Sequence, residues 1–559
     1  MFQAVIDPIA GSLGLSALVA CIPLLVFFII LLGIKAHAHV AAAVALVVAL
    51  LVACLGFNMP AVLALASATQ GAAFGAIPIV FIILMTVWFY QLTVLSGRAN
   101  DLRAFFDSAG GGDIRVQVMM IAFCFGALLE ALAGFGAPVA ITATMILALG
   151  IAPRKAALIV LLANTAPVAF GPVGTPITTA GSMVAGGDSA LAVSTSTHVA
   201  SIVGYQAPVL AFVVPILLIL ILDGKRGLRE CWAPTLVVSL SFSLTQWWCS
   251  NHFAYELTDI AAALISLAAI VIFMRFWHPH GADEARERLG LPAVSARQEH
   301  TLTPARTLMA LAPYLILTIV FSIGKLGIPS FLTSFDIKIA WPLISNGAVL
   351  NAFGTDPGTT FTLGLLSTPG TSILVAGIVA TLVLKIFSEK GRYAISLGAA
   401  VREIGVTAYR MRFSALTIML VLALAYVMNF SGQTMSIGEF LAGSGAAFAF
   451  ISPVLGWVGT AVTGSDTSSN ALFASLQYSA AQANPVYAGV DPDLFLAANT
   501  TGGVIAKMVS PQSLAIAAVS TGEREGDIMK ATLPWSATLL VGLCLLVFLQ
   551  ATCLNGLLP

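Results

Sequence analysis

Two short stretches of the 559-residue sequence place an acidic side chain inside a long apolar run. Glu130 lies in ALLEALAGFGAP, where Gly134, Gly136 and Pro138 follow it, and Asp466 lies in TGSDTSSN. A carboxyl group in apolar surroundings favours its neutral form, so it can take up and release a proton during a cycle. Hydroxyl groups and the free amides at a helix start suit a bound carboxylate. These two stretches therefore predict proton chemistry beside an anion-binding site.

Two further stretches carry polar residues together with residues that interrupt helices. They are NTAPVAFGPVGTP, residues 164–176, and NTTGGVIAKMVSP, residues 499–511. Broken helices free backbone groups to line a site inside a membrane protein. We expect hairpin turns or helix breaks at Gly134, Gly136, Pro138, Pro172, Pro176, Gly502, Gly503 and Pro511. We expect the substrate to contact Asn164, Thr165, Gly464, Ser465, Thr467, Ser468, Asn470, Asn499, Thr500 and Lys507.

Each of these features also has a purely structural interpretation. Glu130 and Asp466, the acids that we expect well inside the membrane, can be neutral groups that close a turn. The hydroxyls near Asp466 can cap two half-helices, although capping needs one or two such residues and this run has more. Lys507 can extend to the cytoplasmic surface instead of pairing with an anionic substrate or with Asp466.

The composition indicates which elements must position these residues. The chain is 59% hydrophobic and 9% charged, with a formal net charge of +0, which is too apolar for a soluble protein of this size. Apolar runs of about 20 residues recur, as membrane-spanning helices require. These features exclude a nucleic-acid-binding surface and a soluble catalytic domain. The seven cysteines lack CxxC spacing, and we expect neither a metal site nor a cofactor.

The fold class predicted is an all-α polytopic membrane protein with about 12 transmembrane helices and two re-entrant hairpins, residues 116–149 and 437–479. The predicted crossings are 15–34, 39–57, 76–95, 156–178, 202–222, 232–250, 259–277, 307–323, 368–386, 413–430, 493–520 and 535–553. Loops 58–71, 181–200 and 251–258 contain no Lys or Arg, which predicts that they lie outside. Both termini then also lie outside.

The chain also contains an internal repeat. A shift of 335 positions superposes LLANT, residues 161–165, on LAANT, residues 496–500, and brings Glu130 within one position of Asp466. The two copies begin on opposite sides of the membrane, so we expect inverted repeats, an architecture typical of transporters. The predicted units are N-terminal helices 1–75, first copy 76–181, connecting helices 182–409 with a cytoplasmic loop 279–303 and an external loop 324–367, second copy 410–520 and C-terminal helix 521–559.

Four blocks of the sequence resemble the bacterial lactate permease family. They are FCFGALLEALAGFGAPVAITA, NTAPVAFGPVGTPI, GWVGTAVTGSDTSSNALFASLQ and NTTGGVIAKMVSPQSLAIA. Ala131, where family members are expected to have Gly, and the additional proline in FGPVGTP depart from the family pattern. The resemblance implies that the chain imports L-lactate, D-lactate and glycolate by proton symport across the bacterial inner membrane.

The residues and the resemblance together predict a permease and not an enzyme. Its partners would be a small monocarboxylate and the lipid bilayer, its coupling ion H⁺, and its proton carrier Glu130 or Asp466. Sodium coupling is the nearest alternative, because tips rich in Ser, Thr and Asn can also coordinate Na⁺. A channel and an intramembrane aspartyl protease built on Asp466 are more distant alternatives.

Overall fold

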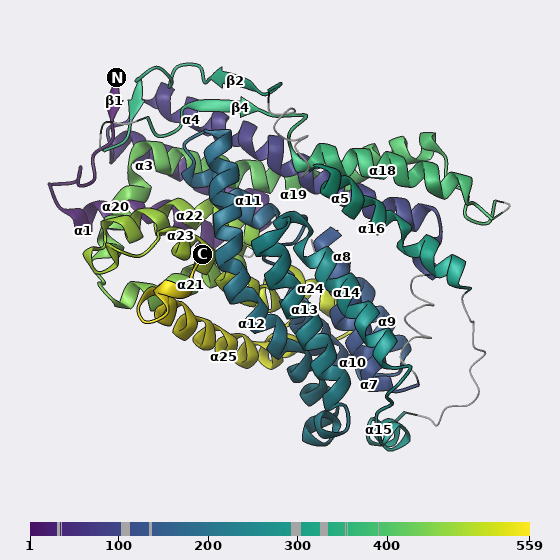
Figure 1. The fold of residues 1–559 in the computed structure, drawn as a ribbon. Helices are drawn as coiled ribbons and strands as arrows, with labels where there is room; N and C mark the ends of the chain where they lie inside the picture. The colour runs from purple at the N-terminus through teal and green to yellow at the C-terminus, as the bar shows by residue number, and fades with distance from the viewer. Residues whose placement is uncertain are drawn as a thin grey trace.

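The computed structural model describes residues 1–30, 34, 36–101, 112–132, 137–291, 303–324, 334–352, 354, 356–389 and 391–559. Within these residues, eight helical segments are long and apolar enough to cross a membrane. Helices α12, α13 and α14 pack side by side through the middle of the molecule, with α25 and α21 on one flank and α5, α16 and α18 on the other (Figure 1). The protein is thus a multi-pass helical membrane protein.

The eight long segments are α3 (Ala38–Leu55), α4 to α5 (Ala61–Phe74 and Phe81–Leu95), α7 to α8 (Ile114–Met119 and Gly126–Leu132), α12 (Ser189–Glu230), α14 (Thr258–Phe273) with the turn before it, α19 (Leu397–Ser431), α23 to α24 (Asp493–Ala506 and Pro511–Thr521) and α25 (Glu525–Ala551). Three of them, α4 to α5, α7 to α8 and α23 to α24, are composite, because each joins two α-helices. The joints of the composite segments are π-helical at Gly75–Val80 and Met120–Phe125 and 3₁₀-helical at Lys507–Val509. Such joints often accompany functional sites.

The remaining elements are shorter or more polar. The helices are α1 (Leu13–Ala20), α2 (Ile22–Phe28), α9 (Ala137–Ala148), α10 (Pro153–Ala163), α11 (Thr175–Val184), α13 (Trp232–His252), α15 (Ala282–Arg288), α16 (Pro304–Gly324), α18 (Pro369–Ile386), α20 (Gln433–Ala442), α21 (Ala447–Thr463) and α22 (Asp466–Ala483). The strands are β1 (Phe2–Gln3), β2 (Ile337–Ala340), β3 (Val349–Leu350) and β4 (Thr360–Leu363).

Four short strands correct the expectation of a purely α-helical chain. β2 pairs with β4 in antiparallel register, and β1 pairs in parallel with β3. The pairs lie together at the upper end of the molecule in Figure 1. Loop 324–367 supplies three of the strands, so the N-terminus and this loop share one end of the protein.

Helix α12 begins earlier than hydropathy predicts. The sequence analysis placed residues 181–200 in a loop, yet α12 starts at Ser189, because the Asp188 side chain accepts hydrogen bonds from the backbone N–H groups of Ala190 and Leu191. An N-cap of this kind initiates a helix irrespective of how apolar the following residues are. The helix then continues through Pro208 and Pro215 and has a non-helical residue at Gly224.

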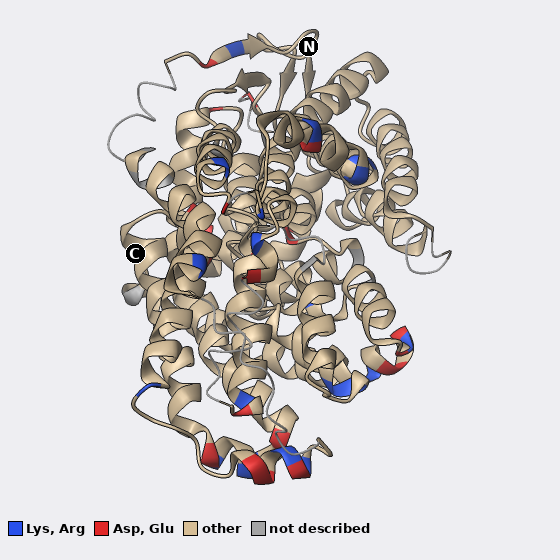
Figure 2. Cartoon of the chain, turned by 90° about the vertical axis from the view of Figure 1, so that its right-hand side faces the viewer, with Lys and Arg blue, Asp and Glu red and all other residues tan. Residues whose placement is uncertain are grey.

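The lower end of the molecule holds a network of buried charges. Figure 2 shows Lys, Arg, Asp and Glu gathered at this end and sparse through the middle. Arg115, with a relative exposure of 0%, donates to Asp113 at 2.7 Å and to Asp223 at 3.2 Å, and also pairs with Glu230. Arg288 on α15 binds the same Asp223 and Glu230 carboxylates. The network therefore ties α7, α12 and α15 together.

Helices of the two predicted copies pack against each other in a crossed arrangement. α22, the second arm of the predicted hairpin 437–479, packs against α11, which follows the break in the first copy. α9, the second arm of the predicted hairpin 116–149, packs against α24, which follows the break in the second copy. The helix that follows each break therefore contacts an arm from the other half of the chain.

Helices α21 and α23 approach so closely that glycine is required at their contact. A Cβ added at Gly502 would overlap the carbonyl oxygen of Pro453, and a Cβ added at Gly456 would overlap that of Asn499. Small residues allow such backbone contact between helices in a membrane. The contact fixes α21, which leads to Asp466, against α23, which leads to Lys507.

We predict that Arg115→Met destabilises the protein by about 3–5 kcal/mol, because it leaves the surrounding carboxylates buried without their cation. Unfolding by increasing SDS in mixed detergent micelles measures the change. The matched control is Arg226→Met, since Arg226 is 70% exposed and pairs with Glu230 at 3.2 Å; such a surface pair contributes about 0–1 kcal/mol. Equal effects of the two substitutions would contradict the structural role of Arg115.

We predict that Gly502→Ala lowers the free energy of unfolding by about 1–3 kcal/mol, because the contact is with rigid backbone and α21 must move. The same SDS titration measures it. Gly542→Ala in α25 is the control, since a Cβ added there meets nothing within 4 Å. If Gly502→Ala is as stable as Gly542→Ala, the close contact between α21 and α23 is wrong.

Candidate functional site

The turn that carries Asp466 is a tight junction between α21 and α22. α21 ends at Gly464, which adopts the left-handed conformation (φ 76°), and Ser465 caps α22 by accepting from the Ser468 backbone N–H at 3.3 Å. Asp466 follows in the first turn of α22 and is buried. Its Oδ1 accepts from Thr460 Oγ1 at 3.3 Å, whereas Oδ2 has no partner in the described part of the chain.

Glu130 lies near the end of α8, before the chain turns toward α9, whereas Asp466 lies after its turn. The Glu130 side chain is 2% exposed, and Oε2 has no hydrogen-bond partner among the described residues. Gly134 and Gly136 lie outside the described residues, and Pro138 is buried in the first turn of α9. Gly171 packs against Glu130: an added Cβ would lie 3.2 Å from the Glu130 carbonyl oxygen.

The first broken crossing is interrupted between α10 and α11. α10 ends at Ala163, and turns continue to Gly174, where Val173 and Gly174 both have positive φ. Pro172 lies within these turns, and Pro176 stands at the start of α11, where its missing N–H costs nothing. The interruption predicted at residues 164–176 is therefore present, and it presents Asn164 at the end of α10.

The second broken crossing is interrupted later than the sequence suggested. Gly502 and Gly503 lie inside α23, so the expectation that they break this helix is wrong. The interruption is a 3₁₀ turn, Lys507–Val509, followed by extended Ser510 and by Pro511 at the start of α24. The two glycines instead permit close contact, since a Cβ added at Gly503 would overlap Asp466 Oδ1.

Lys507 is the cation of this region. It is 6% exposed, so its side chain does not extend to the surface, and Nζ donates to the Gly464 carbonyl at 2.9 Å. No ion pair of the described residues joins Lys507 to Glu130 or Asp466. The ammonium group instead adds a longer-range positive charge to the surroundings of these two buried acids from distant parts of the sequence.

Three of the predicted binding residues form a network with each other. Asn470 Oδ1 accepts from Asn499 Nδ2 at 2.7 Å and from Thr500 Oγ1 at 3.1 Å, and Asn470 Nδ2 donates to the Pro176 carbonyl at 3.1 Å. Asn499 Oδ1 in turn accepts from Gln477 Nε2 at 2.7 Å. The network joins α22, α23 and α11, so its amides hold the helices together.

Other predicted residues retain free polar groups. Neither amide atom of Asn164 makes a hydrogen bond within the described chain, although Asn164 lies beside Glu130 and interacts with its carboxyl. Thr467 and Ser468 are buried residues, and neither hydroxyl makes a hydrogen bond with any described residue. Thr165 differs, because its hydroxyl is bonded to the Leu162 carbonyl at 2.7 Å.

Sequence reasoning missed several polar residues of this region. Gln477 and Thr460 bond to predicted site residues, and Asp259 on α14 is buried beside Gln246 on α13. Gln477 lies eleven residues after Asp466 in the same helix, so helical spacing offered a signal for it. Asp259 stands at the edge of a predicted crossing, where hydropathy alone does not distinguish a buried acid from a surface one.

A group that could ligate a metal lies apart from these residues. His198, Asp491 and Asp493 offer donor atoms within 4.8 Å of one another. His198 Nδ1 is 2.9 Å from Asp493 Oδ2 and 3.7 Å from Asp491 Oδ2, so the three side chains already pair with each other. This geometry is that of an ion pair linking the third turn of α12 to the start of α23.

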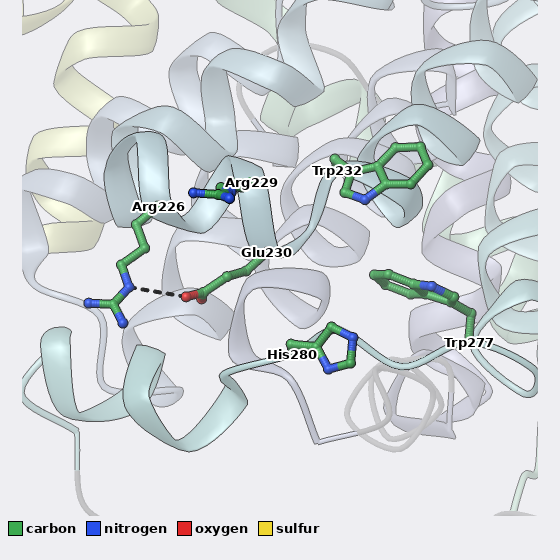
Figure 3. A pocket seen from close by; sticks show the side chains of 6 residues that line it. All are labelled: Arg226, Arg229, Glu230, Trp232, Trp277 and His280. Carbon is green, nitrogen blue, oxygen red and sulfur yellow. Dashed lines mark hydrogen bonds and ion pairs between the residues drawn. The ribbon is translucent and has the colours of Figure 1, made fainter.

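A pocket of about 490 Å³ opens at the charged lower end of the molecule. Figure 3 shows its lining residues, with Arg226 pointing toward Glu230 and two tryptophans on the opposite side: Arg226, Arg229, Glu230, Trp232, Trp277 and His280. None of these is a predicted substrate or proton residue. The pocket is therefore separate from the buried site around Lys507.

The sequence can be compared with known proteins. The family model described as L-lactate permease matches residues 16–554. A glycolate permease of Escherichia coli (strain K12) is 38% identical over 572 residues, which cover 98% of each chain. L-lactate permeases of Bacillus subtilis (strain 168) and E. coli (strain K12) are 37% and 38% identical and cover 99% and 100% of both chains. The chain therefore belongs to the L-lactate permease family, whose members are permeases and not enzymes.

Proposed function

We propose that this permease imports L-lactate and the related 2-hydroxy monocarboxylates D-lactate and glycolate across the bacterial inner membrane by proton symport. The family and the relatives named for lactate and glycolate support this substrate class. The coupling to protons is supported by one observation above all: the buried Lys507 interacts with two buried acids, Glu130 and Asp466.

The balance of charges in this region favours taking up a proton together with the anion. With both acids ionised, Lys507 compensates one of two negative charges, and a bound lactate would add another. An unpaired charge in such surroundings costs at least several kcal/mol. Protonation of Glu130 or Asp466 restores the charge that the site had before the anion arrived.

The energetics of transport favour the same coupling. A membrane potential that is negative inside opposes entry of an anion by about 2.3 kcal/mol per 100 mV. One proton carried with each lactate cancels this term, and an inward proton gradient supplies about 1.4 kcal/mol for each pH unit. A buried acid that becomes neutral and charged in turn is the component that such a cycle requires.

Among the predicted binding residues, those with free polar groups are best suited to contact the substrate. In this proposal the Lys507 ammonium and the hydroxyls of Thr467 and Ser468 bind the carboxylate, and Asn164 binds the 2-hydroxyl. Asn470, Asn499 and Thr500 hold α22 and α23 in place through their mutual hydrogen bonds. Ser465 and Gly464 shape the turn that presents these groups.

The crossed packing of the two copies supports alternating access. In this proposal α8–α9 and α21–α22 are re-entrant hairpins of two inverted repeats, and the sidedness of the termini follows from the positive-inside pattern. Since the helix that follows each break contacts an arm of the other copy, movement of the hairpins against the outer helices displaces both of these helices together. The site is then open to one side at a time.

We predict that purified protein in sodium-free proteoliposomes accumulates labelled L-lactate when the outside is more acidic than the inside. With one proton per lactate and no membrane potential, a difference of one pH unit supports about tenfold accumulation. A protonophore should abolish the accumulation, and saturation with lactate concentration distinguishes a carrier from a channel. Accumulation that requires sodium and ignores the pH gradient would overturn proton symport.

We predict that Glu130→Gln or Asp466→Asn, or both, abolish concentrative uptake, because an amide of nearly the same shape cannot carry the proton. Uptake under the pH gradient measures the loss, and unfolding in SDS shows whether each variant is folded. Glu439→Gln on α20 is the matched control, since Glu439 lies outside this region. If both variants still accumulate lactate, neither acid carries the proton.

A further inference from the structure

Asp259 is a third buried acid, and neither the sequence analysis nor the proposed cycle uses it. It lies in the first turn of α14 and is 1% exposed. Its Oδ1 accepts a hydrogen bond from Gln246 Nε2 at 2.8 Å, while its Oδ2 has no partner among the described residues. A buried carboxyl oxygen without a donor is costly if the group carries a charge.

Gln246 connects Asp259 to the first broken crossing. Its Nε2 also donates to the Ala166 carbonyl at 3.3 Å, in the turns that follow Asn164. Gln246 is itself fully buried on α13. Through Gln246, Asp259 is therefore connected to the turns between α10 and α11, where Asn164 lies near Glu130.

Asp259 and Glu130 lie on helices α14 and α8, which pack together, and each acid has one carboxyl oxygen without a partner among the described residues. The other titratable groups around Asp259 are the Cys249 thiol on α13 and Tyr255 and Glu256 in the turn before α14. Tyr255 is hydrogen-bonded to Thr178 at 2.9 Å. None of these groups is a cation, and no ion pair of the described chain includes Asp259.

Asp259 lacks the nearby positive charge that the other two acids have. Lys507 contributes to the surroundings of Glu130 and Asp466, whereas Asp259 has only the amide of Gln246 among the described residues. Two neighbouring buried acids with so little positive charge near them do not both ionise at neutral pH. They hold one proton between them and titrate as a pair.

We propose that Glu130 and Asp259 form a shared proton-binding site, in which Asp259 holds the coupling proton before Glu130 receives it and Gln246 positions Asp259. This inference rests on the proposed proton symport. A substrate carboxylate that binds beside Lys507 offsets part of the positive charge that stabilises the ionised form of Glu130. The O–H bond on Asp259 then breaks, an O–H bond forms on Glu130, and the charge of the pair stays the same.

The position of Asp259 fits this order of events. The turn between α13 and α14, residues 253–257, directly precedes it and lies in the loop that the sequence predicts to be external. Asp259 is therefore the acid of the pair nearer that loop, and it regains its proton from there. A purely structural role for Asp259, stabilising the start of α14, would be fulfilled equally well by asparagine.

The test measures lactate-induced proton entry into proteoliposomes with an internal pH dye, as a function of external pH. For Asp259→Asn we expect the midpoint of this pH dependence to lie about one pH unit lower than in the wild type, because Glu130 no longer has a negative neighbour. Asp188→Asn is the matched control, since Asp188 is an exposed acid that caps α12; its midpoint should equal that of the wild type.

The outcomes separate this inference from the proposed function. If the wild type itself takes up no protons with lactate, proton symport is wrong. If the wild type does so and Asp259→Asn has an unchanged midpoint, the shared site is wrong while symport stands. Lactate exchange at equal pH on both sides reports whether the variant is folded and inserted.

A second measurement covers the case in which Asp259→Asn does not fold. In Asp466→Asn protein, the Glu130–Asp259 pair remains the buried acid pair of this region. Infrared difference spectra between alkaline and neutral pH should then show one protonated carboxylic acid per chain at neutral pH. Its absence would overturn the shared site.

Discussion

The compensation of charge among buried side chains is the constraint on which this structure depends. Glu130, Asp466 and Lys507 are all buried, and the ammonium group is the cation that acts on both acids. Lys507 is itself held by the carbonyl of Gly464, which points inward because the residue adopts a left-handed conformation. The position of the charge thus follows from a backbone turn that favours glycine.

The same constraint explains why so many amides occur around this centre. Breaks in helices leave carbonyl and N–H groups that lipid cannot satisfy. Asn470 satisfies the Pro176 carbonyl of the first break, and Gln477 and Asn499 complete its network. Asn164 differs in that its amide has no such bond within the described residues. The first break therefore keeps unused hydrogen-bonding capacity beside Glu130, whereas the second break is largely satisfied.

Much of this could be predicted from the sequence, and the failures have physical causes. Glu130, Asp466 and Lys507 were recognisable because a charge in an apolar run is rarely without a role. Gly502 and Gly503 were wrongly expected to break the helix, because glycine can either weaken a helix or permit close packing. The positions of Pro453 and Asp466 beside them show that close packing is their role here. Asp259 was overlooked because the hydropathy pattern places the start of a membrane-spanning helix there. Hydropathy does not indicate which residues of other helices cover that position. The start of α12 depended on one capping side chain, Asp188, within a polar stretch.

The separation of Glu130 and Lys507 along the chain also constrains how the protein is made. The two residues are 377 positions apart, so at about 5–20 residues per second a ribosome adds the cation roughly 20–75 seconds after the acid. During this interval the first copy leaves the insertion machinery with a carboxyl group that has no counterion. Glu130 must therefore enter the bilayer as a neutral acid. Its ionised form is stabilised only after the part of the chain that contains Lys507 has been inserted. Insertion of the chain into the membrane thus by itself favours a protonated Glu130.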